Sequence, residues 1–192
     1  MAGNEIKSHT KENYLKALFH LTSESGEVAV NELARQLELK MPSVTSMMQR
    51  LADEKLIKYE KYKPVSLTEK GRREAGLVIR KHRLTEMFLV KKMNFGWEEV
   101  HEIAEQIEHI KAPSFFQKMD EMLGFPTVDP HGSPIPDKDG KIKSFERKTL
   151  SEVQEGKTVH LTGLAQSAED FLKFLNSKEI GLGVTIKVLK KN

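Results

Sequence analysis

The sequence contains no cysteine among its 192 residues, which excludes disulfide bridges, cysteine zinc sites and iron–sulfur clusters. A chain without disulfides suits a reducing compartment, so we expect a cytoplasmic protein. No apolar run approaches the roughly 18 residues of a membrane-spanning helix. The N-terminal stretch "MAGNEIKSHTKEN" is polar throughout and lacks the pattern of a secretory signal. We therefore expect no membrane partner.

The sequence also lacks the motifs of common enzyme classes. It has no GxSxG, P-loop or glycine-rich dinucleotide fingerprint. The stretch that begins at His101 opens like the HExxH signature of zinc peptidases, but its fifth residue is Glu105 instead of histidine. "DKDG" at 137–140 begins like a calcium loop and lacks the later ligands. We therefore expect that the protein is not an enzyme.

The chain contains many residues of both charges, but the basic and acidic residues are unevenly distributed along it. Charged residues make up 31% of the chain and apolar residues 38%, which fits a soluble protein with one large or two small domains. Residues 40–73 carry nine Lys or Arg against four acids, although the net charge of the whole chain is only +3. Residues 98–109 carry five glutamates and neither Lys nor Arg. The chain thus separates a basic region from an acidic one.

The basic region has the pattern of a DNA-binding domain. Apolar spacing predicts helices in "ENYLKALFHL", "VNELARQLEL" and "PSVTSMMQRLADEKL", with Thr10 and Asn31 as caps of the first two and Pro42 opening the third. Two strands around a tight turn at Lys63-Pro64 follow, and Thr68 caps the next helix. Two helices joined by a short turn and followed by a β-hairpin make a winged helix-turn-helix.

The outward face of the third helix has groups that suit DNA recognition. Apolar residues at 44, 47, 48 and 51 form its core face, which leaves hydroxyl, amide and guanidinium groups outside. Small hydroxyl side chains allow close approach to the DNA backbone, and longer ones reach base edges or phosphates. A solvated helix face is the alternative, and the local positive charge favours DNA. The predicted DNA-binding residues are Lys40, Pro42, Ser43, Thr45, Ser46, Gln49, Arg50, Lys61 and Lys63.

The acidic stretch "VHEIAEQIEH" at 100–109 gathers groups that bind metals. On a helix with about 100° per residue and His101 as zero, Glu105 falls at about 40°, Glu108 at about −20° and His109 at about 80°. Residues 103, 104 and 107 lie opposite and can pack. Carboxylate and imidazole without thiolate suit Mn²⁺ or Fe²⁺ and also admit Zn²⁺. A solvated acidic face is the alternative.

A second pair of such groups lies upstream, on a helix predicted at 68–93. His82 and Glu86 are spaced i and i+4, which places them on one side of this helix. An ordinary surface pair is the alternative. If this helix and the acidic helix meet, their histidines and glutamates together could enclose divalent cations.

Several apolar residues predict a contact between two copies of the chain. They are too apolar for a free surface, and an intramolecular core is the alternative. These residues are Phe115, Phe116, Met119, Met122 and Leu123, together with Met87, Phe88 and Leu89.

The remainder of the chain changes character. Residues 126–145 hold several prolines and glycines, which predicts a linker or an extended loop. From about 146, strands "KTVHLTG" and "GVTIKVLKK" surround a helix in "SAEDFLKFLN" and predict a small β-rich domain. About 45 residues are few for an independent barrel, so an incomplete domain is the alternative to a complete one.

Six stretches together resemble the metal-dependent transcriptional repressors of the diphtheria toxin repressor type, which include the manganese transport regulators. They are "ENYLKALFHL", "PSVTSMMQRL", "YEKYKPVSLTEKG", "RKHRLTEMFL", "VHEIAEQIEH" and "HGSPIP", and the resemblance covers nearly all of the chain. It implies a mainly α fold with small β elements. The implied domains are a winged-helix DNA-binding domain at 1–75, a helical metal-binding and dimerisation domain at 76–125, a linker at 126–145 and an SH3-like domain at 146–192.

The resemblance also implies two metal sites. Three residues of the acidic helix match the site that activates DNA binding: Glu105, Glu108 and His109. An ancillary site is matched by His82, Glu86 and His101. The stretch that lends ancillary ligands in iron-responsive members corresponds to Glu169 and Asp170.

The metal-binding motifs depart from the family pattern at the N-terminal helix. Asn13 stands where the family usually has a Met or Asp ligand, and Lys16 stands where the shorter manganese regulators have a Glu ligand. At Glu105 the chain carries the residue of manganese-responsive members, where iron-responsive members have cysteine. Asn13 is therefore an expected ligand of the activating site, and the exact coordination is left open.

The sequence thus predicts a cytoplasmic, non-enzymatic homodimer that represses transcription by binding double-stranded operator DNA when charged with Mn²⁺ or Fe²⁺. Zn²⁺ is expected to bind in vitro. Two alternatives remain open. One is a winged-helix regulator that senses an organic ligand, with the acidic helix merely structural. The other is a metal-dependent hydrolase, against which the absence of a nucleophile or base motif weighs.

Overall fold

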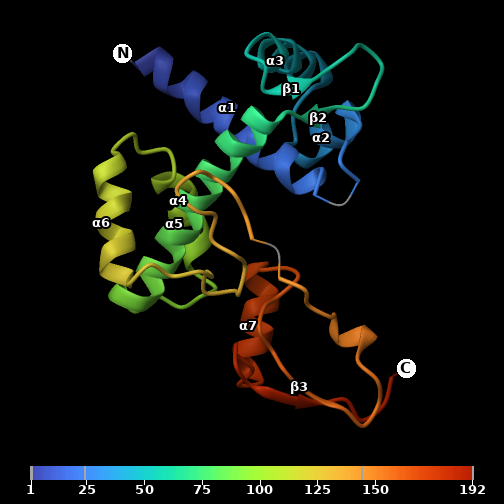
Figure 1. Cartoon of the computed structure of the whole chain (residues 1–192), viewed down its shortest axis with the longest axis vertical. Coiled ribbons are helices and arrows are strands. Elements are labelled where there is room, and N and C mark those ends of the chain that lie inside the picture. The colour runs from blue at the N-terminus through green and yellow to red at the C-terminus, as the bar shows by residue number, and fades with distance from the viewer. Residues whose placement is uncertain (1, 24, 144, 192) are drawn as a thin grey trace. The chain divides into compact units, whose positions relative to one another are not determined.

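A computed structural model describes residues 2–23, 25–143 and 145–191, with only the backbone described for 2–10 (Figure 1). The chain forms two compact units. The first comprises the residues up to Arg80 together with Pro136–Ile142, and the second comprises Lys81–Ile135 together with the residues from Lys143 onward. No helix in the described part of the chain is both long and apolar enough to cross a membrane.

The first unit is a winged helix-turn-helix, as the sequence predicts. Its elements are α1 (Ala2–Leu21), α2 (Val30–Gln36), α3 (Met41–Asp53), β1 (Ile57–Lys58), β2 (Ser66–Leu67) and the first half of α4 (Glu69–Met93). The strands pair antiparallel, with Ile57 opposite Leu67. Apolar side chains from all of these elements form one core, which includes Tyr14, Leu18, Leu33, Val44, Met48 and Leu56.

Only some of the predicted capping residues lie at the N-terminal ends of the helices in this unit. Lys40 is the N-cap of α3, and Pro42 lies in its first turn, one residue later than the first helical position that the sequence predicts. Thr68 caps α4, because its Oγ1 accepts the Gly71 N–H at 3.0 Å. The caps expected at Thr10 and Asn31 were wrong, since both residues lie inside helices. Val28 pairs with Val65 and keeps the chain extended up to Ala29, so α2 begins directly at Val30.

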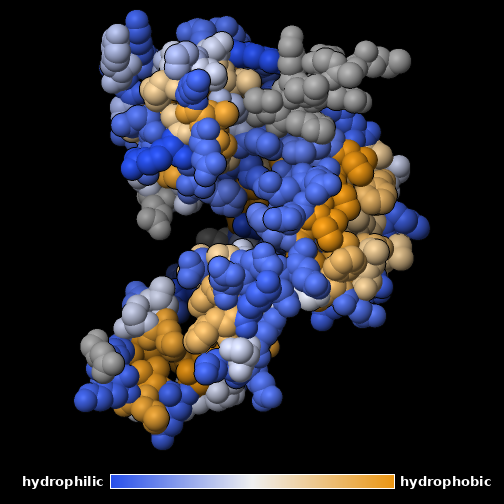
Figure 2. Space-filling view, turned by 180° about the vertical axis from the view of Figure 1, so that it is seen from behind, coloured by the Kyte–Doolittle hydropathy of each residue, from blue (hydrophilic) through white to orange (hydrophobic). Residues whose placement is uncertain are grey.

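The second unit contains the rest of α4 with α5 (Val100–Ile107), α6 (Pro113–Leu123) and the C-terminal elements. Leu84, Phe116, Met119 and Ile135 form its core. The apolar residues expected at a dimer contact therefore divide into two groups. Phe116, Met119, Met87 and Leu89 are buried within the chain, and Phe88 and Leu123 are partly buried against the same core, whereas Phe115 and Met122 remain exposed. Figure 2 shows apolar side chains gathered on the face that includes α6.

The C-terminal elements match the predicted order of strand, helix and strand. They are a 3₁₀ turn η1 (Leu150–Glu152), β3 (Thr158–His160), α7 (Glu169–Ser177) and β4 (Thr185–Lys187). The two strands pair antiparallel, with Val159 opposite Ile186. Within the described residues they form a sheet of two strands. The fold is thus mainly helical with small β elements, as expected, while the assignment of an SH3-like domain stays a prediction.

Within the described residues, the proline-rich segment 126–145 is an extended loop, of which Pro136–Ile142 belongs to the first unit and the rest to the second. Its "DKDG" stretch forms a turn, because Asp137 Oδ1 accepts the N–H groups of Asp139 and Lys141 at 2.9 Å each. This turn belongs to the first unit, where Gly140 packs against Gly76 of α4. The resemblance of this stretch to a calcium loop is therefore explained by turn geometry.

Candidate metal centre

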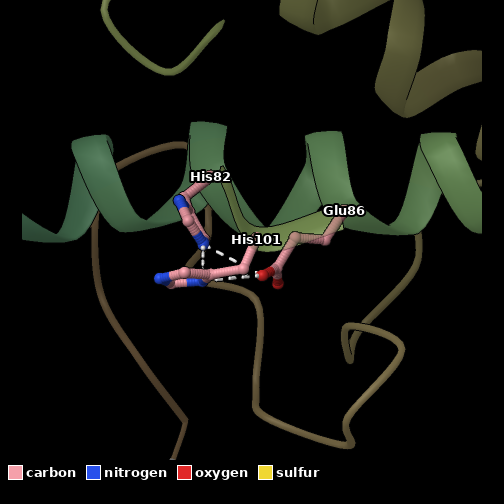
Figure 3. A group of neighbouring side chains, drawn as sticks. All are labelled: His82, Glu86 and His101. Atoms are coloured by element: carbon pink, nitrogen blue, oxygen red, sulfur yellow. Dashed lines mark hydrogen bonds and ion pairs between the residues drawn. The ribbon is translucent and has the colours of Figure 1, made fainter. Parts of the chain in front are cut away.

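Helices α4 and α5 bring together an imidazole–carboxylate group in the second unit (Figure 3). His82 and Glu86 lie one turn apart on α4, and His101 comes from the first turn of α5. His82 Nε2 lies 3.0 Å from Glu86 Oε1 and 3.2 Å from His101 Nδ1. His101 Nδ1 lies 3.4 Å from the same Glu86 oxygen. The residues assigned to the ancillary site are thus neighbours.

The spacing of these three atoms fits a bound divalent cation. Cation–ligand bonds of roughly 2.1 Å place neighbouring ligand atoms about 3.0–3.4 Å apart in octahedral or tetrahedral geometry. The three observed separations, 3.0, 3.2 and 3.4 Å, cover this range. Two imidazoles and a carboxylate also match the ligand preference of Mn²⁺, Fe²⁺ and Zn²⁺.

Glu108 lies behind the His82 ring and orients it. Its Oε2 is 2.5 Å from His82 Nδ1, and its side chain is fully buried. One proton lies in this contact, and it engages Nδ1 whichever partner carries it. Metal-binding histidines commonly donate their second ring N–H to a carboxylate in this way. This contact therefore points the other ring nitrogen of His82 towards Glu86 and His101.

The residues assigned to the activating site surround the same histidine. Glu105, Glu108 and His82 form a second group whose ligand atoms lie within 4.8 Å of one another. His109 Nε2 lies 3.7 Å from Glu108 Oε1 and is buried, although α5 ends at Ile107. Glu105 is half exposed and lies 3.9 Å from His101. The two observed groups of metal-binding side chains are therefore adjacent, and His82 belongs to both.

Burial and pairing set the charge of the centre. Burial alone would raise the pKa of Glu86, but contacts with His101 and His82 outweigh it and hold that pKa well below its usual range. Burial and the nearby Glu86 raise the pKa of Asp129. Burial lowers the pKa of Arg83, whose Nε lies 3.5 Å from Asp129 Oδ2. Glu86 is thus an ionised carboxylate inside the protein, which favours a cation beside it.

Two further residues of this neighbourhood come from the loop after α6, and no sequence pattern assigned them a role. Asp129 and His131 form a third group with Glu86, and all three are buried. His131 Nδ1 lies 3.8 Å from Glu86 Oε2. The only sequence signal was that "HGSPIP", which contains His131, belongs to the stretches that carry the family resemblance.

Among the described residues, His109, Glu169 and Asp170 belong to none of these groups, although His109 lies beside Glu108. Glu169 and Asp170 lie exposed in the first turn of α7, where Glu169 Oε1 pairs with Lys173 at 2.6 Å. Asn13 lies exposed on α1, in the first unit. Their roles as ligands stay predictions.

The predicted DNA-binding residues lie on the surface of the first unit. Those on α3 and before it are exposed, except for Thr45, which is half-buried. Gln49 donates to Asp53 at 3.2 Å, and Arg50 Nε lies 3.4 Å from Glu54. In the wing, Lys61 and Lys63 flank Tyr62, whose side chain is 91% exposed. This surface presents groups that suit phosphates and base edges.

Two family models match consecutive parts of the chain. The model described as "Iron dependent repressor, N-terminal DNA binding domain" matches residues 8–65. The model described as "Iron dependent repressor, metal binding and dimerisation domain" matches residues 68–137. The first match runs from within α1 to the residue before β2, and the second covers α4 to α6 with their metal groups.

Individual relatives agree with these matches. The iron-dependent repressor IdeR of Mycobacterium tuberculosis is 35% identical over 66% of this chain, and the chain spans 55% of that protein. A solved manganese-dependent transcriptional repressor in complex with manganese is 30% identical with a TM-score of 0.85, covering 95% of this chain and 84% of that one.

A cadmium-bound structure of ScaR is 33% identical with a TM-score of 0.81, covering 95% of this chain and 85% of that one. With two family models in tandem and solved relatives over nearly the whole fold, the chain belongs to the iron-dependent repressor family, which also contains manganese-dependent repressors.

Proposed function

We propose that this protein is a cytoplasmic, non-enzymatic repressor that binds operator DNA as a homodimer when it holds Mn²⁺ or Fe²⁺. The observation that carries the proposal is the largely buried pair His82 and Glu86, with Glu108 orienting His82 towards Glu86 and the more exposed His101. Such an arrangement costs desolvation energy, and a bound cation offsets it. The winged helix of the first unit supplies the DNA-binding surface.

The residues of the centre would act through charge. A bound cation would supply positive charge between α4 and α5, with Glu105, Glu108 and His109 as ligands on one side of His82 and Glu86 and His101 on the other. Glu86 and Glu108 are both buried, and like charges in a protein interior repel strongly unless they are compensated. The cation-free protein would therefore tolerate several arrangements of these helices, and the cation-bound protein would favour one.

The homodimer in this proposal would use the exposed apolar residues of the second unit. Phe115, Met122 and Phe125 are 43%, 52% and 66% exposed. They lie on α6 and directly after it, within the stretch that matches the dimerisation domain. A two-fold dimer would present two recognition helices, which suits DNA half-sites about one helical turn apart.

Operator binding measured after chelation tests the proposed function. The protein is stripped with a chelator, and Mn²⁺, Fe²⁺ under anaerobic conditions and Zn²⁺ are then titrated in while fluorescence anisotropy of labelled operator DNA is recorded. We expect that the chelated protein does not bind operator DNA specifically, and that it binds this DNA saturably after a metal ion is added. Specific binding that persists in the chelated protein would contradict metal activation and favour a regulator of another kind.

Arg50→Ala and Lys63→Ala should each weaken DNA binding and reduce its salt dependence. Each lost phosphate contact removes about one unit from the slope of log affinity against log salt concentration. Both side chains are exposed, so the fold should be preserved. The measurement is operator affinity between low and high salt, with Lys187→Ala in the second unit as control. If the slope of log affinity against log salt concentration is unchanged in both variants, α3 and the wing do not contact the DNA.

Asn13→Asp should increase the affinity for Mn²⁺ if Asn13 is a ligand, because a carboxylate binds a hard cation better than a neutral amide oxygen. The measurement is isothermal titration of Mn²⁺ into wild type, Asn13→Asp and Asn13→Ala. Equal affinities in the three proteins would show that Asn13 is not a ligand.

A further inference from the structure

The turn of the wing places an aromatic residue where the backbone favours glycine. The loop between β1 and β2 projects from the first unit (Figure 1), and it turns where the carbonyl oxygen of Glu60 accepts the Lys63 N–H at 3.1 Å. Tyr62, the third residue of this turn, has φ of +68°. This left-handed conformation brings Cβ close to the following carbonyl oxygen, and bulky residues adopt it rarely. The backbone at Tyr62 is therefore strained.

Packing within the protein does not offset this strain. The Tyr62 side chain is 91% exposed, so it buries almost no apolar area. The Lys61 ammonium lies 5.1 Å from the centre of the tyrosine ring, and a cation–π contact between two exposed groups is weak. Glycine or asparagine would fit the third position of such a turn better. Folding alone therefore gives no reason for a tyrosine at this position.

The surroundings of Tyr62 favour a polyanionic partner. Within four residues of it there are three exposed lysines and one acid, which are Lys58, Lys61, Lys63 and Glu60. This excess of positive charge is complementary to phosphates. A tyrosine combines an apolar ring with a hydroxyl that can donate or accept a hydrogen bond, and these groups match the sugar and the phosphate of a DNA backbone. The wing thus fits DNA better than it fits an apolar protein surface.

We propose that Tyr62 contacts the sugar–phosphate backbone of operator DNA, with its ring against a deoxyribose and its hydroxyl directed at a phosphate. The turn holds the ring away from the protein before DNA arrives, so little conformational freedom is lost on binding. The first unit is therefore less stable than a glycine at this position would make it. The inference rests on the proposed function, since it requires the wing to face operator DNA.

Tyr62→Gly tests this inference, because it should change stability and DNA binding in opposite directions. Glycine adopts a positive φ without strain, so the melting temperature of the cation-free full chain should rise by about 1–4 °C. The affinity of the Mn²⁺-saturated protein for labelled operator DNA, measured by fluorescence anisotropy, should fall about fivefold or more, as when an interface tyrosine is truncated. A tyrosine that served only the fold would show a lower melting temperature and an unchanged affinity.

Further measurements distinguish a contact made by the ring from one made by charge. Tyr62→Gly removes no cation, so the slope of log affinity against log salt concentration should match wild type, whereas Lys63→Ala should reduce it by about one unit. The DNA backbone carries no sequence information, so the affinities for operator and for random-sequence DNA should fall by the same factor. Tyr62→Phe keeps the ring and loses only the hydroxyl, so its operator affinity should lie between those of wild type and Tyr62→Gly.

Glu179→Gly is the matched control. Glu179 is also exposed and has φ of +56°, but it lies after α7 in the second unit. Its replacement relieves the same kind of backbone strain without altering the wing. The affinity for operator DNA should therefore stay at the wild-type value, while the protein is not destabilised.

The outcomes separate this inference from the proposed function. Wild-type protein that binds no operator DNA in the presence of Mn²⁺, Fe²⁺ or Zn²⁺ would overturn both. Metal-dependent binding by wild type with unchanged affinity in Tyr62→Gly would overturn the role of Tyr62 alone, and the exposed ring would then serve another partner, such as a protein. A melting temperature that falls in Tyr62→Gly would show that the ring supports the fold, which would also overturn the inference.

Discussion

Glu108→Gln should abolish cation-activated DNA binding in a protein that remains folded. Glu108 is fully buried, contacts His82 Nδ1 and lies near His109. Glutamine keeps the shape and an oxygen acceptor for His82 but removes the negative charge that a cation requires. Loss of an outer partner alone costs about 10–100-fold in metal affinity, so loss of a direct ligand should cost at least about 100-fold. Calorimetric Mn²⁺ titration and operator binding measure the two effects.

The control for this substitution is Glu102→Gln, on the same helix. Glu102 is exposed and belongs to none of the metal groups found among the described residues. Glu102→Gln removes the same charge from α5 without altering the centre. The affinities for Mn²⁺ and for operator DNA should therefore stay within about twofold of wild type, in line with small surface effects. If the two variants behave alike, the general charge of α5 and not a ligand role of Glu108 would explain the loss.

Local patterns in the sequence predicted the elements that carry the centre. Apolar spacing located α3 and α4, and the Thr68 cap and the hairpin before it were found from turn and capping chemistry. The spacing of His82 and Glu86 correctly placed both on one side of α4. These features depend on residues within one or two turns of each other, and single-sequence patterns contain that information.

The relation between the two metal groups could not be predicted, because it depends on how α4 packs against α5. A helical projection placed His101, Glu105, Glu108 and His109 on one face of α5 but gave no reason for Glu108 to face His82. The helix ends at Ile107, so His109 is positioned by the turn that follows and not by helical periodicity. Sharing of His82 is thus a property of tertiary packing.

The tertiary contacts of the loop at 126–145 could not be predicted from the sequence either. Its prolines and glycines predicted irregular backbone, which is correct, but composition does not indicate which side chains are buried. Asp129 and His131 are each 3% exposed and reach Glu86 from more than 40 residues away in the sequence. Likewise, the composition of "DKDG" did not indicate that Gly140 packs against Gly76. Contacts of this kind require the fold.

That last contact leads to the largest expected change in stability, from Gly76→Ala. Gly76 is buried on α4, and an added Cβ would overlap the carbonyl oxygen of Gly140. The clash is with backbone, so no side-chain rotation relieves it. Gly140 itself has φ of +75°, and two hydrogen bonds to Asp137 hold its turn together, so the turn can relieve the clash only by moving as a whole away from α4. Overpacking of this kind costs about 3 kcal/mol.

Differential scanning calorimetry measures the effect, and about 2–4 °C of melting temperature is expected for each kcal/mol in a chain of this size. Gly181→Ala is the matched control, because nothing lies within 4 Å of its added Cβ. In a helix an alanine is by itself about 1 kcal/mol more favourable than a glycine, so propensity alone predicts that Gly76→Ala stabilises the protein. A melting temperature that rises, or that falls no further than in Gly181→Ala, would therefore show that the loop yields and that its contact with α4 is not tight.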